Sequence, residues 1–214
     1  MLIIINLKAY DIDPQTIIDA ISNTEIPQHV TVGIAAQPMD IPSLVTSDIP
    51  VFAQHIDPIS AGSYTGSILP KHVARAGATG SLLNHSEKRL KLADIETAID
   101  RAQKVGLSTV VCANTPAQSK AISVFGPDAI AIEPPELIGT GTPVSKADPD
   151  LIEDTVATVK TIDETIDVFC GAGISSGSDV KKAADLGAEG VLVASGVAKA
   201  DNPTAALQEL VSEI

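Results

Sequence analysis

The sequence predicts a single (β/α)8 barrel of the α/β class, and three observations lead to that prediction. Short apolar runs, rich in β-branched residues, alternate with amphipathic stretches along the 214 residues. The runs are apolar on both faces, which is typical of parallel strands that helices cover. There are eight such runs, and strict alternation of eight strands with helices fits a closed barrel. We expect one domain over residues 1–214, because the length suits one domain and no segment has the composition of a linker.

The elements can be placed in order from the apolar runs and from the residues that punctuate them. Strands are expected at Leu2–Ile5, Val30–Ile34, Val51–Ala53, Gly80–Leu83, Ser108–Cys112, Ala129–Ile132, Val168–Cys170 and Gly190–Val193. Four helices should begin where a capping side chain precedes a proline, since proline at the first helical position sacrifices no hydrogen bond. These starts are Asp13-Pro14, Thr115-Pro116, Asp148-Pro149 and Asn202-Pro203, and helix ends are expected near Gly77, Gly106 and Gly187.

Two similar segments support a structure made of repeated units. Residues 74–83 and 184–193 both run from a helix end through Gly-Ala-x-Gly into an apolar strand, about half the chain apart. The competing fold, a doubly wound open sheet, normally has a glycine fingerprint after its first strand, whereas this strand runs into Asn6-Leu7-Lys8. A typical barrel has ~250 residues, and this chain has only 214. We therefore expect the helices after strands two and five to be reduced to turns.

Composition excludes several classes of protein. The formal net charge is −13, from 14 basic and 27 acidic residues, so no surface for nucleic acid or anionic membranes is expected. We interpret the charge as an acidic shell suited to high salt. Cys112 and Cys170 lack CxxC spacing and are expected to be buried, reduced thiols. Without a signal-like start or a run of ~18 apolar residues, we expect a cytoplasmic location.

Polar side chains follow the expected strands, where the reactive groups of a barrel belong. Asn6 and Lys8 follow strand one, and a lysine after an apolar strand needs an anion or access to water. His85 follows strand four in a segment expected to open a short helical turn, whose dipole would favour a neutral imidazole. Glu133 ends strand six, where burial would raise the pKa of its carboxyl and make it a better base. Taken singly, Lys8 could equally be a solvated loop lysine, and His85 could be a structural histidine. We interpret His29, His55 and His72 as structural histidines.

Small residues after the last two strands predict a phosphate site. Gly171-Ala172-Gly173-Ile174-Ser175-Ser176-Gly177 follows strand seven, and Ala194-Ser195-Gly196 follows strand eight. Backbone N–H groups can converge at such turns, and barrels commonly hold phosphate after these two strands. The segment after Glu133 combines two prolines with the tip Ile138-Gly139-Thr140-Gly141, which is the composition expected of a rigid lid on hinges.

Together these motifs resemble the triosephosphate isomerase family, in the shorter form found among archaea. The matching pieces are Asn6-Leu7-Lys8, Gly62-Ser63-Tyr64-Thr65-Gly66, Asn84-His85-Ser86-Glu87-Lys88-Arg89, Ala131-Ile132-Glu133-Pro134-Pro135, Ile138-Gly139-Thr140-Gly141 and Cys170-Gly171-Ala172-Gly173. They stand in the family's order over nearly the whole chain. The resemblance implies a TIM barrel that interconverts dihydroxyacetone phosphate and glyceraldehyde 3-phosphate, in glycolysis and gluconeogenesis, without a metal or an organic cofactor.

The resemblance also implies individual roles. Glu133 would be the base that moves a proton between two carbons through an enediolate, and His85 the neutral electrophile that polarises the carbonyl. Lys8 would stabilise the enediolate charge, and Asn6 would help to position the oxygens. The backbone would hold the phosphate at Ile138, Gly173, Ala194 and Ser195. The loop Gly62–Gly66 would insert into a neighbouring subunit, giving a homodimer, and the short archaeal form would be a homotetramer.

Some residues depart from the family's pattern, and two other functions stay open. Cys170 and Glu136 stand where longer relatives carry a tyrosine and a tryptophan that latch the closed lid, while Ala194-Ser195 replaces two glycines and keeps their amides. Another phosphate-binding barrel, such as an isomerase of an amino-acid pathway, would share the phosphate turns. A sugar-phosphate sensor or scaffold built on the barrel would bind the phosphate ligand without exchanging its carbon-bound hydrogen. Lys8, His85 and Glu133 distinguish the triosephosphate isomerase family from the other enzyme, and the intact His85, Glu133 and lid argue against the sensor.

Overall fold

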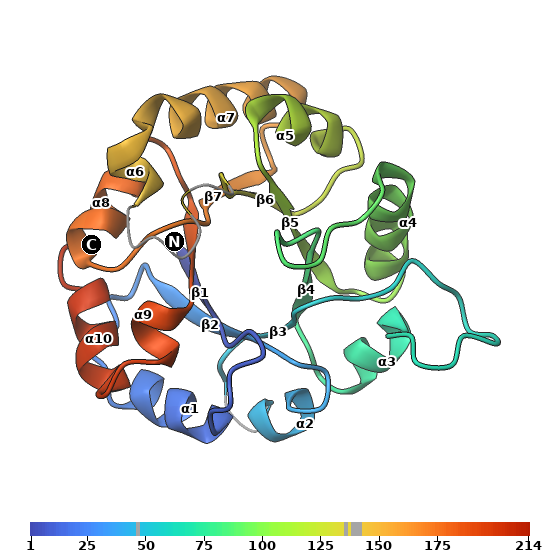
Figure 1. Cartoon of the computed structure of the whole chain (residues 1–214), viewed down its shortest axis with the longest axis horizontal. Helices are drawn as coiled ribbons and strands as arrows, with labels where there is room; N and C mark the ends of the chain where they lie inside the picture. Colours follow the sequence, from blue (N-terminus) through green and yellow to red (C-terminus); the bar gives the residue numbers. More distant parts are fainter. Residues whose placement is uncertain (46–47, 135–136, 138–142) are drawn as a thin grey trace.

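The predicted barrel is confirmed by the computed structural model, which describes residues 1–45, 48–134, 137 and 143–214. Within these residues eight parallel strands pair in chain order, and β8 closes the ring on β1 (Figure 1). The strands are β1 (Leu2–Asn6), β2 (Thr31–Ala36), β3 (Val51–Ala53), β4 (Gly80–Leu83), β5 (Ser108–Ala113), β6 (Ala129–Ile132), β7 (Asp167–Cys170) and β8 (Gly190–Val193). The closed ring excludes the open, doubly wound sheet.

The helices surround the strands as an outer ring (Figure 1). They are α1 (Pro14–Ser22), α2 (Ile41–Leu44), α3 (Pro70–Arg75), α4 (Leu92–Gln103), α5 (Pro116–Ser123), α6 (Val144–Ala147), α7 (Pro149–Ile162), α8 (Gly177–Asp185), α9 (Ser195–Ala198) and α10 (Pro203–Leu210). The four predicted starts are confirmed: Asp13, Thr115, Asp148 and Asn202 each accept a hydrogen bond from a backbone N–H of the first turn. No helix in the described part of the chain is long and apolar enough to cross a membrane.

The prediction of two shortened helices is half right. After β2 the chain makes only the four-residue α2, as expected. After β5 it makes the eight-residue α5, so that expectation is wrong. Thr115 caps α5, and Ile122 on its inner face is buried, so this helix has both a start signal and a packed face. The helix after β3, α3, is also short with six residues, because much of the chain between β3 and α3 forms a projecting loop (Figure 1).

Two apolar layers hold the barrel. One fills its interior and includes Ile4, Phe52, Leu82, Phe169 and Leu192. The larger layer lies between the sheet and the helices. Cys112 and Cys170 are buried and free, as predicted.

The repeated Gly-Ala-x-Gly segments form equivalent turns. Gly77 and Gly187 have φ of +96° and +94°, the left-handed backbone that closes a helix end. The second glycines, Gly80 and Gly190, begin β4 and β8, where a Cβ would lie within 3 Å of a phenylalanine ring in the barrel interior. Each segment therefore uses one glycine for the turn and one for close packing.

Candidate active site

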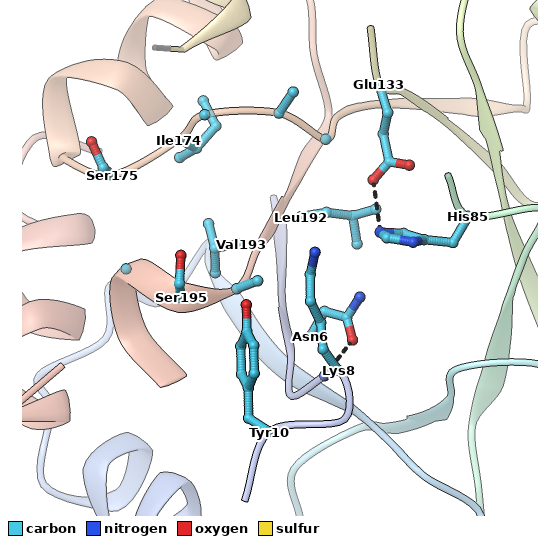
Figure 2. Close-up of a pocket in the computed structure, with 15 residues that line it drawn as sticks. Asn6, Lys8, Tyr10, His85, Glu133, Ile174, Ser175, Leu192, Val193 and Ser195 are labelled. Carbon is cyan, nitrogen blue, oxygen red and sulfur yellow. Dashed lines mark hydrogen bonds and ion pairs between the residues drawn. The ribbon is translucent and has the colours of Figure 1, made fainter. Parts of the chain in front are cut away.

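The predicted site residues converge on one cavity at the carboxyl end of the barrel. The cavity has a volume of about 340 Å³ and lies among the residues that follow β1, β4, β6, β7 and β8 (Figure 2). Its lining includes Asn6, Lys8, His85, Glu133, Gly173, Ala194 and Ser195. Ile138, with Glu136 and the expected lid tip, lies outside the described residues. The barrel thus brings together side chains that are up to 189 positions apart in the sequence.

Glu133 extends from the end of β6 into this cavity, and its side chain is only 2% exposed. Burial raises the pKa of this carboxyl to about 7, although the Cys112 thiol and the charges of Arg89 and Lys8 act to lower it. Within the described residues its Oε2 atom has no hydrogen-bond partner. A desolvated carboxylate with a free oxygen is a stronger base than a solvated one, as the sequence predicts.

Gly171 makes room for this carboxylate. A Cβ at position 171 would lie 2.4 Å from the Cγ atom of Glu133, far closer than two carbon atoms can approach. The glycine that follows β7 therefore leaves the space that the Glu133 side chain occupies.

His85 faces Glu133 across the cavity, with 3.5 Å between its Nε2 atom and Oε1 of the carboxylate (Figure 2). The backbone N–H of Glu87 donates to Nδ1 of the imidazole over 3.2 Å, which places the ring proton of the neutral form on Nε2. Burial, followed by the charge of Lys8, lowers the pKa of His85. A neutral imidazole therefore presents an N–H group to the cavity.

The short turn predicted at His85 is confirmed, but the cause we gave for the neutral imidazole is wrong. Lys88 N–H donates to the carbonyl of His85 over 2.8 Å and closes a single turn, but α4 begins only at Leu92. Asn84 has φ of +55° and its side chain bonds both to Cys112 of β5 and to Leu90. These side-chain hydrogen bonds hold the rest of the segment as a loop. Burial and the nearby Lys8 ammonium, and not a helix dipole, therefore lower the pKa of His85.

Lys8 brings a positive charge to the same cavity. Its side chain is 15% exposed, and its Nζ atom lies 2.7 Å from a carboxylate oxygen of Glu87. The backbone at Lys8 is left-handed, with φ of +49°, and its N–H donates to the Asn6 side chain over 2.9 Å. Asn6 thus stabilises the unfavourable left-handed backbone at Lys8, which directs the ammonium towards the cavity.

The opposite side of the cavity is built from backbone and small side chains. Within the described residues, no hydrogen bond engages the N–H groups of Gly173, Ser195 and Gly196. The buried Asp179 of α8 accepts from the backbone of Ser175 and Ser176 and forms an ion pair with Lys146 at 2.6 Å. The carboxylate therefore fixes the turn after β7, while free amides remain for an anion.

Sequence reasoning missed two contributors to this site, Tyr10 and Asp179. Tyr10 lines the cavity, as does Ser175 of the motif after strand seven, and Arg89 of the motif after strand four donates to the Asn84 carbonyl at 2.5 Å. Tyr10 follows Lys8 by two residues, so its position after β1 was the available signal. The role of Asp179 had no such signal, because a carboxylate in the first turn of a helix is common on protein surfaces.

Comparison with known proteins agrees with this geometry. The family described as triosephosphate isomerase matches residues 1–213. A triosephosphate isomerase of Methanocaldococcus jannaschii is 50% identical to this chain over 222 residues, which cover all of both chains. The chain belongs to the triosephosphate isomerase family. A triosephosphate isomerase of Halobacterium salinarum is 52% identical over the full length of both chains, and one of Methanobrevibacter smithii is 53% identical over 86% of this chain and 84% of its own. Membership of the triosephosphate isomerase family makes the protein an isomerase.

Proposed function

We propose that the cavity interconverts dihydroxyacetone phosphate and D-glyceraldehyde 3-phosphate, the reaction used in glycolysis and gluconeogenesis. The observation that supports this most is the buried Glu133 carboxylate beside a neutral His85, with the Lys8 ammonium lining the same cavity. Aldose-ketose isomerisation needs a base for a carbon-bound proton and donors for the oxygens. The three groups supply those functions without a further reactant.

In the proposed mechanism one proton moves between two carbons. The Glu133 carboxylate removes a proton from C1 of dihydroxyacetone phosphate, and the carbonyl oxygen on C2 gains the electron pair to give an enediolate. The ammonium of Lys8 and the Nε2–H of His85 stabilise that negative charge. His85 passes its proton to the C2 oxygen and recovers one from the C1 hydroxyl. Protonated Glu133 then returns its proton to C2, which gives the aldehyde and restores the base.

The phosphate would bind at the opposite side of the cavity. Free N–H groups of Gly173, Ser195 and Gly196 support this placement, since a dianion can be held by amides alone. Ala194 is the residue before α9, and Ile138 stays a prediction. Separating phosphate binding from proton transfer keeps a doubly negative group away from the Glu133 carboxylate.

A substrate comparison tests the proposed function. We expect saturable isomerisation of glyceraldehyde 3-phosphate in a coupled assay and no turnover of a bulkier ribosyl phosphate. Turnover of the ribosyl compound alone would identify another phosphate-binding barrel. Binding of triose phosphate with no exchange of its carbon-bound hydrogen would identify a sensor.

We also propose that the chain forms a dimer through the loop Gly62–Gly66. Residues 60–67 are all exposed, and the loop projects from the barrel between β3 and α3 (Figure 1). A second cavity of about 240 Å³ lies beside Lys8 and is lined by Gln54 and His55. In a two-fold dimer each loop would enter the other subunit's cavity. Deleting the loop tip should halve the mass measured by light scattering; an unchanged mass would contradict the dimer.

A second surface supports the expected homotetramer. A groove of about 510 Å³ runs between α4 and α5, and it is lined by apolar residues that include Leu92, Ile95 and Ile122. Leu92 is 51% exposed. Two different two-fold surfaces on one chain give a tetramer. Leu92→Glu should leave active dimers, and a tetramer that survives this change would contradict the assignment.

A further inference from the structure

Tyr10 lines the catalytic cavity although no role has been given to it so far. It closes the turn that carries Lys8, since its backbone N–H donates to the Leu7 carbonyl over 3.3 Å. Asn6, the last residue of β1, and Lys8 and Tyr10, two and four positions later, therefore all line the same cavity. Tyr10 is one of only two tyrosines in the sequence.

The phenol is directed towards the phosphate side of this cavity. Figure 2 shows the ring standing along the wall, with its hydroxyl oxygen pointing into the cavity on the side of Ser195. Glu133 and His85 lie across the cavity from it (Figure 2). Among the described residues, no group forms a hydrogen bond with this hydroxyl. Its proton is therefore available to a ligand.

The Tyr10 ring contacts the residue that follows the C-terminal end of α9, and the first turn of this helix faces the phosphate side of the cavity. Ala194 and Lys199 are the residues that flank α9 on either side. The Nζ atom of Lys199 lies 5.1 Å from the centre of the Tyr10 ring, which is within the range of a cation–π contact. Ser195, at the start of α9, faces the cavity towards which the hydroxyl points. One short helix therefore fixes the phenol relative to the free amides of Ser195 and Gly196.

We propose that the Tyr10 hydroxyl donates a hydrogen bond to the phosphate group of the substrate, beside the amides of Ser195 and Gly196. This inference rests on the proposed function, because it assumes a phosphate at that side of the cavity. The donor is useful here because the chain carries a net charge of −13 and the Lys8 ammonium is already paired with Glu87. A hydroxyl adds a donor for the anion without a second ammonium at the reacting carbons.

The Tyr10→Phe variant tests the proposal, because it keeps the ring and its contact with Lys199 and removes only the donor. A hydrogen bond to a charged group is worth about tenfold or more in affinity. We expect the KM for glyceraldehyde 3-phosphate and the inhibition constant of inorganic phosphate each to rise about tenfold, while kcat changes by less than about twofold. Unchanged values of both constants would overturn the proposal.

A phosphate-free substrate separates this role from a structural one. The rate of hydrogen exchange from D-glyceraldehyde, which lacks the phosphate, should be equal in the Tyr10→Phe variant and the unchanged protein. An equal loss for D-glyceraldehyde and for the phosphorylated triose would show that the phenol shapes the reacting end, and would also overturn the proposal. Calorimetry with inorganic phosphate gives the same comparison without turnover, so the Tyr10 assignment can fail or stand even if the unchanged protein isomerises no triose phosphate.

Lys199 offers a second variant with a matched control. Lys199→Met removes the cation over the ring, so the KM for glyceraldehyde 3-phosphate should rise by a smaller factor of about threefold. Lys182 is an exposed lysine of α8, and Lys182→Met removes the same charge away from the cavity. It should leave KM unchanged. Equal effects of the two changes would show that only net charge matters, and would contradict the positioning of Tyr10 by Lys199.

Discussion

The two sides of the cavity are built from different materials. The side of Glu133 and His85 consists of titratable side chains whose pKa values are shifted by burial. The side of Gly173 and Ser195 consists of backbone amides and residues with small side chains. Proton transfer requires a group whose charge can change, whereas an anion can be bound by fixed dipoles. The comparison predicts large losses in kcat for changes on the first side and modest changes in KM for changes on the second.

The largest effect is expected for Glu133→Asp. The shorter carboxylate retreats from the reacting carbon, so kcat should fall about a thousandfold while KM changes little. Steady-state kinetics with glyceraldehyde 3-phosphate measure both, and the melting temperature serves as a control for folding. A kcat like that of the unchanged protein would remove Glu133 from the role of base.

Glu133→Gln should make the folded protein more stable above pH 7. Because burial raises the pKa of this carboxyl from 4.5 to about 7, the folded protein binds more protons than the unfolded chain between these values. The stability that the Glu133 carboxyl contributes to the folded protein is therefore greatest below pH 4.5 and is lost as the pH rises to 7. The glutamine has no charge to bury, so its unfolding free energy should exceed that of the unchanged protein by about 3 kcal/mol above pH 7.

Denaturant titrations at pH 4.5 and pH 8 measure this difference. The exposed Glu153 of α7 supplies a matched control, since Glu153→Gln should shift stability equally little at both pH values. A Glu133→Gln variant that is no more stable at pH 8 than the unchanged protein would show that the pKa of the Glu133 carboxyl is not raised.

His85→Gln should lower kcat about a hundredfold, because removing one donor from a developing oxyanion costs that much. An amide keeps a donor but cannot exchange protons between the two oxygens of the enediolate. Burst and steady-state kinetics would show the loss in the chemical step with KM nearly constant. A rise in KM alone would place His85 on the binding side instead.

A pair of glycine substitutions sharpens the comparison. Gly171→Ala brings a Cβ to 2.4 Å from Glu133 Cγ and should lower kcat about tenfold by displacing the base. At Gly196 the nearest atoms to an added Cβ are 3.9 Å away, so Gly196→Ala should change KM by less than about threefold and leave kcat alone. Equal effects on kcat would erase the distinction between the two sides.

A modest effect, on KM alone, is expected for Asp179→Asn. The buried carboxylate accepts from Ser175 and Ser176 and pairs with Lys146. Asparagine keeps the shape but loses the charge, so the turn loosens and KM should rise about fivefold with kcat unchanged. Inhibition by inorganic phosphate should weaken by the same factor. A loss confined to kcat would contradict a role in phosphate binding.

The sequence predicted the barrel well because its signals are local. The caps at Asp13 and Thr115, and the glycines at Gly77 and Gly187, mark helix ends through backbone chemistry that is independent of the rest of the fold. How the His85 segment is held after its predicted turn could not be foreseen. Its conformation depends on the Asn84 side chain reaching Cys112 on the next strand, a contact between residues 28 positions apart.

The reactive side chains of the candidate site could be predicted from the sequence, whereas the residues that orient them could not. Lys8, His85 and Glu133 stand out because each follows an apolar strand and carries a reactive side chain. Tyr10 and Asp179 were missed because their contribution lies in where they point and what they orient. Those properties follow from packing around α8 and α9, and sequence pattern does not encode them directly.

Exchange of substrate hydrogen with solvent tests the central claim, that Glu133 carries a proton between two carbons of a triose phosphate. Dihydroxyacetone phosphate incubated in D2O should take up deuterium on carbon with the unchanged protein, as followed by nuclear magnetic resonance. With Glu133→Asp the rate of uptake should fall about a thousandfold. Deuterium uptake at equal rates in both proteins, or isomerisation by the unchanged protein without any uptake across repeated turnovers, would contradict the account.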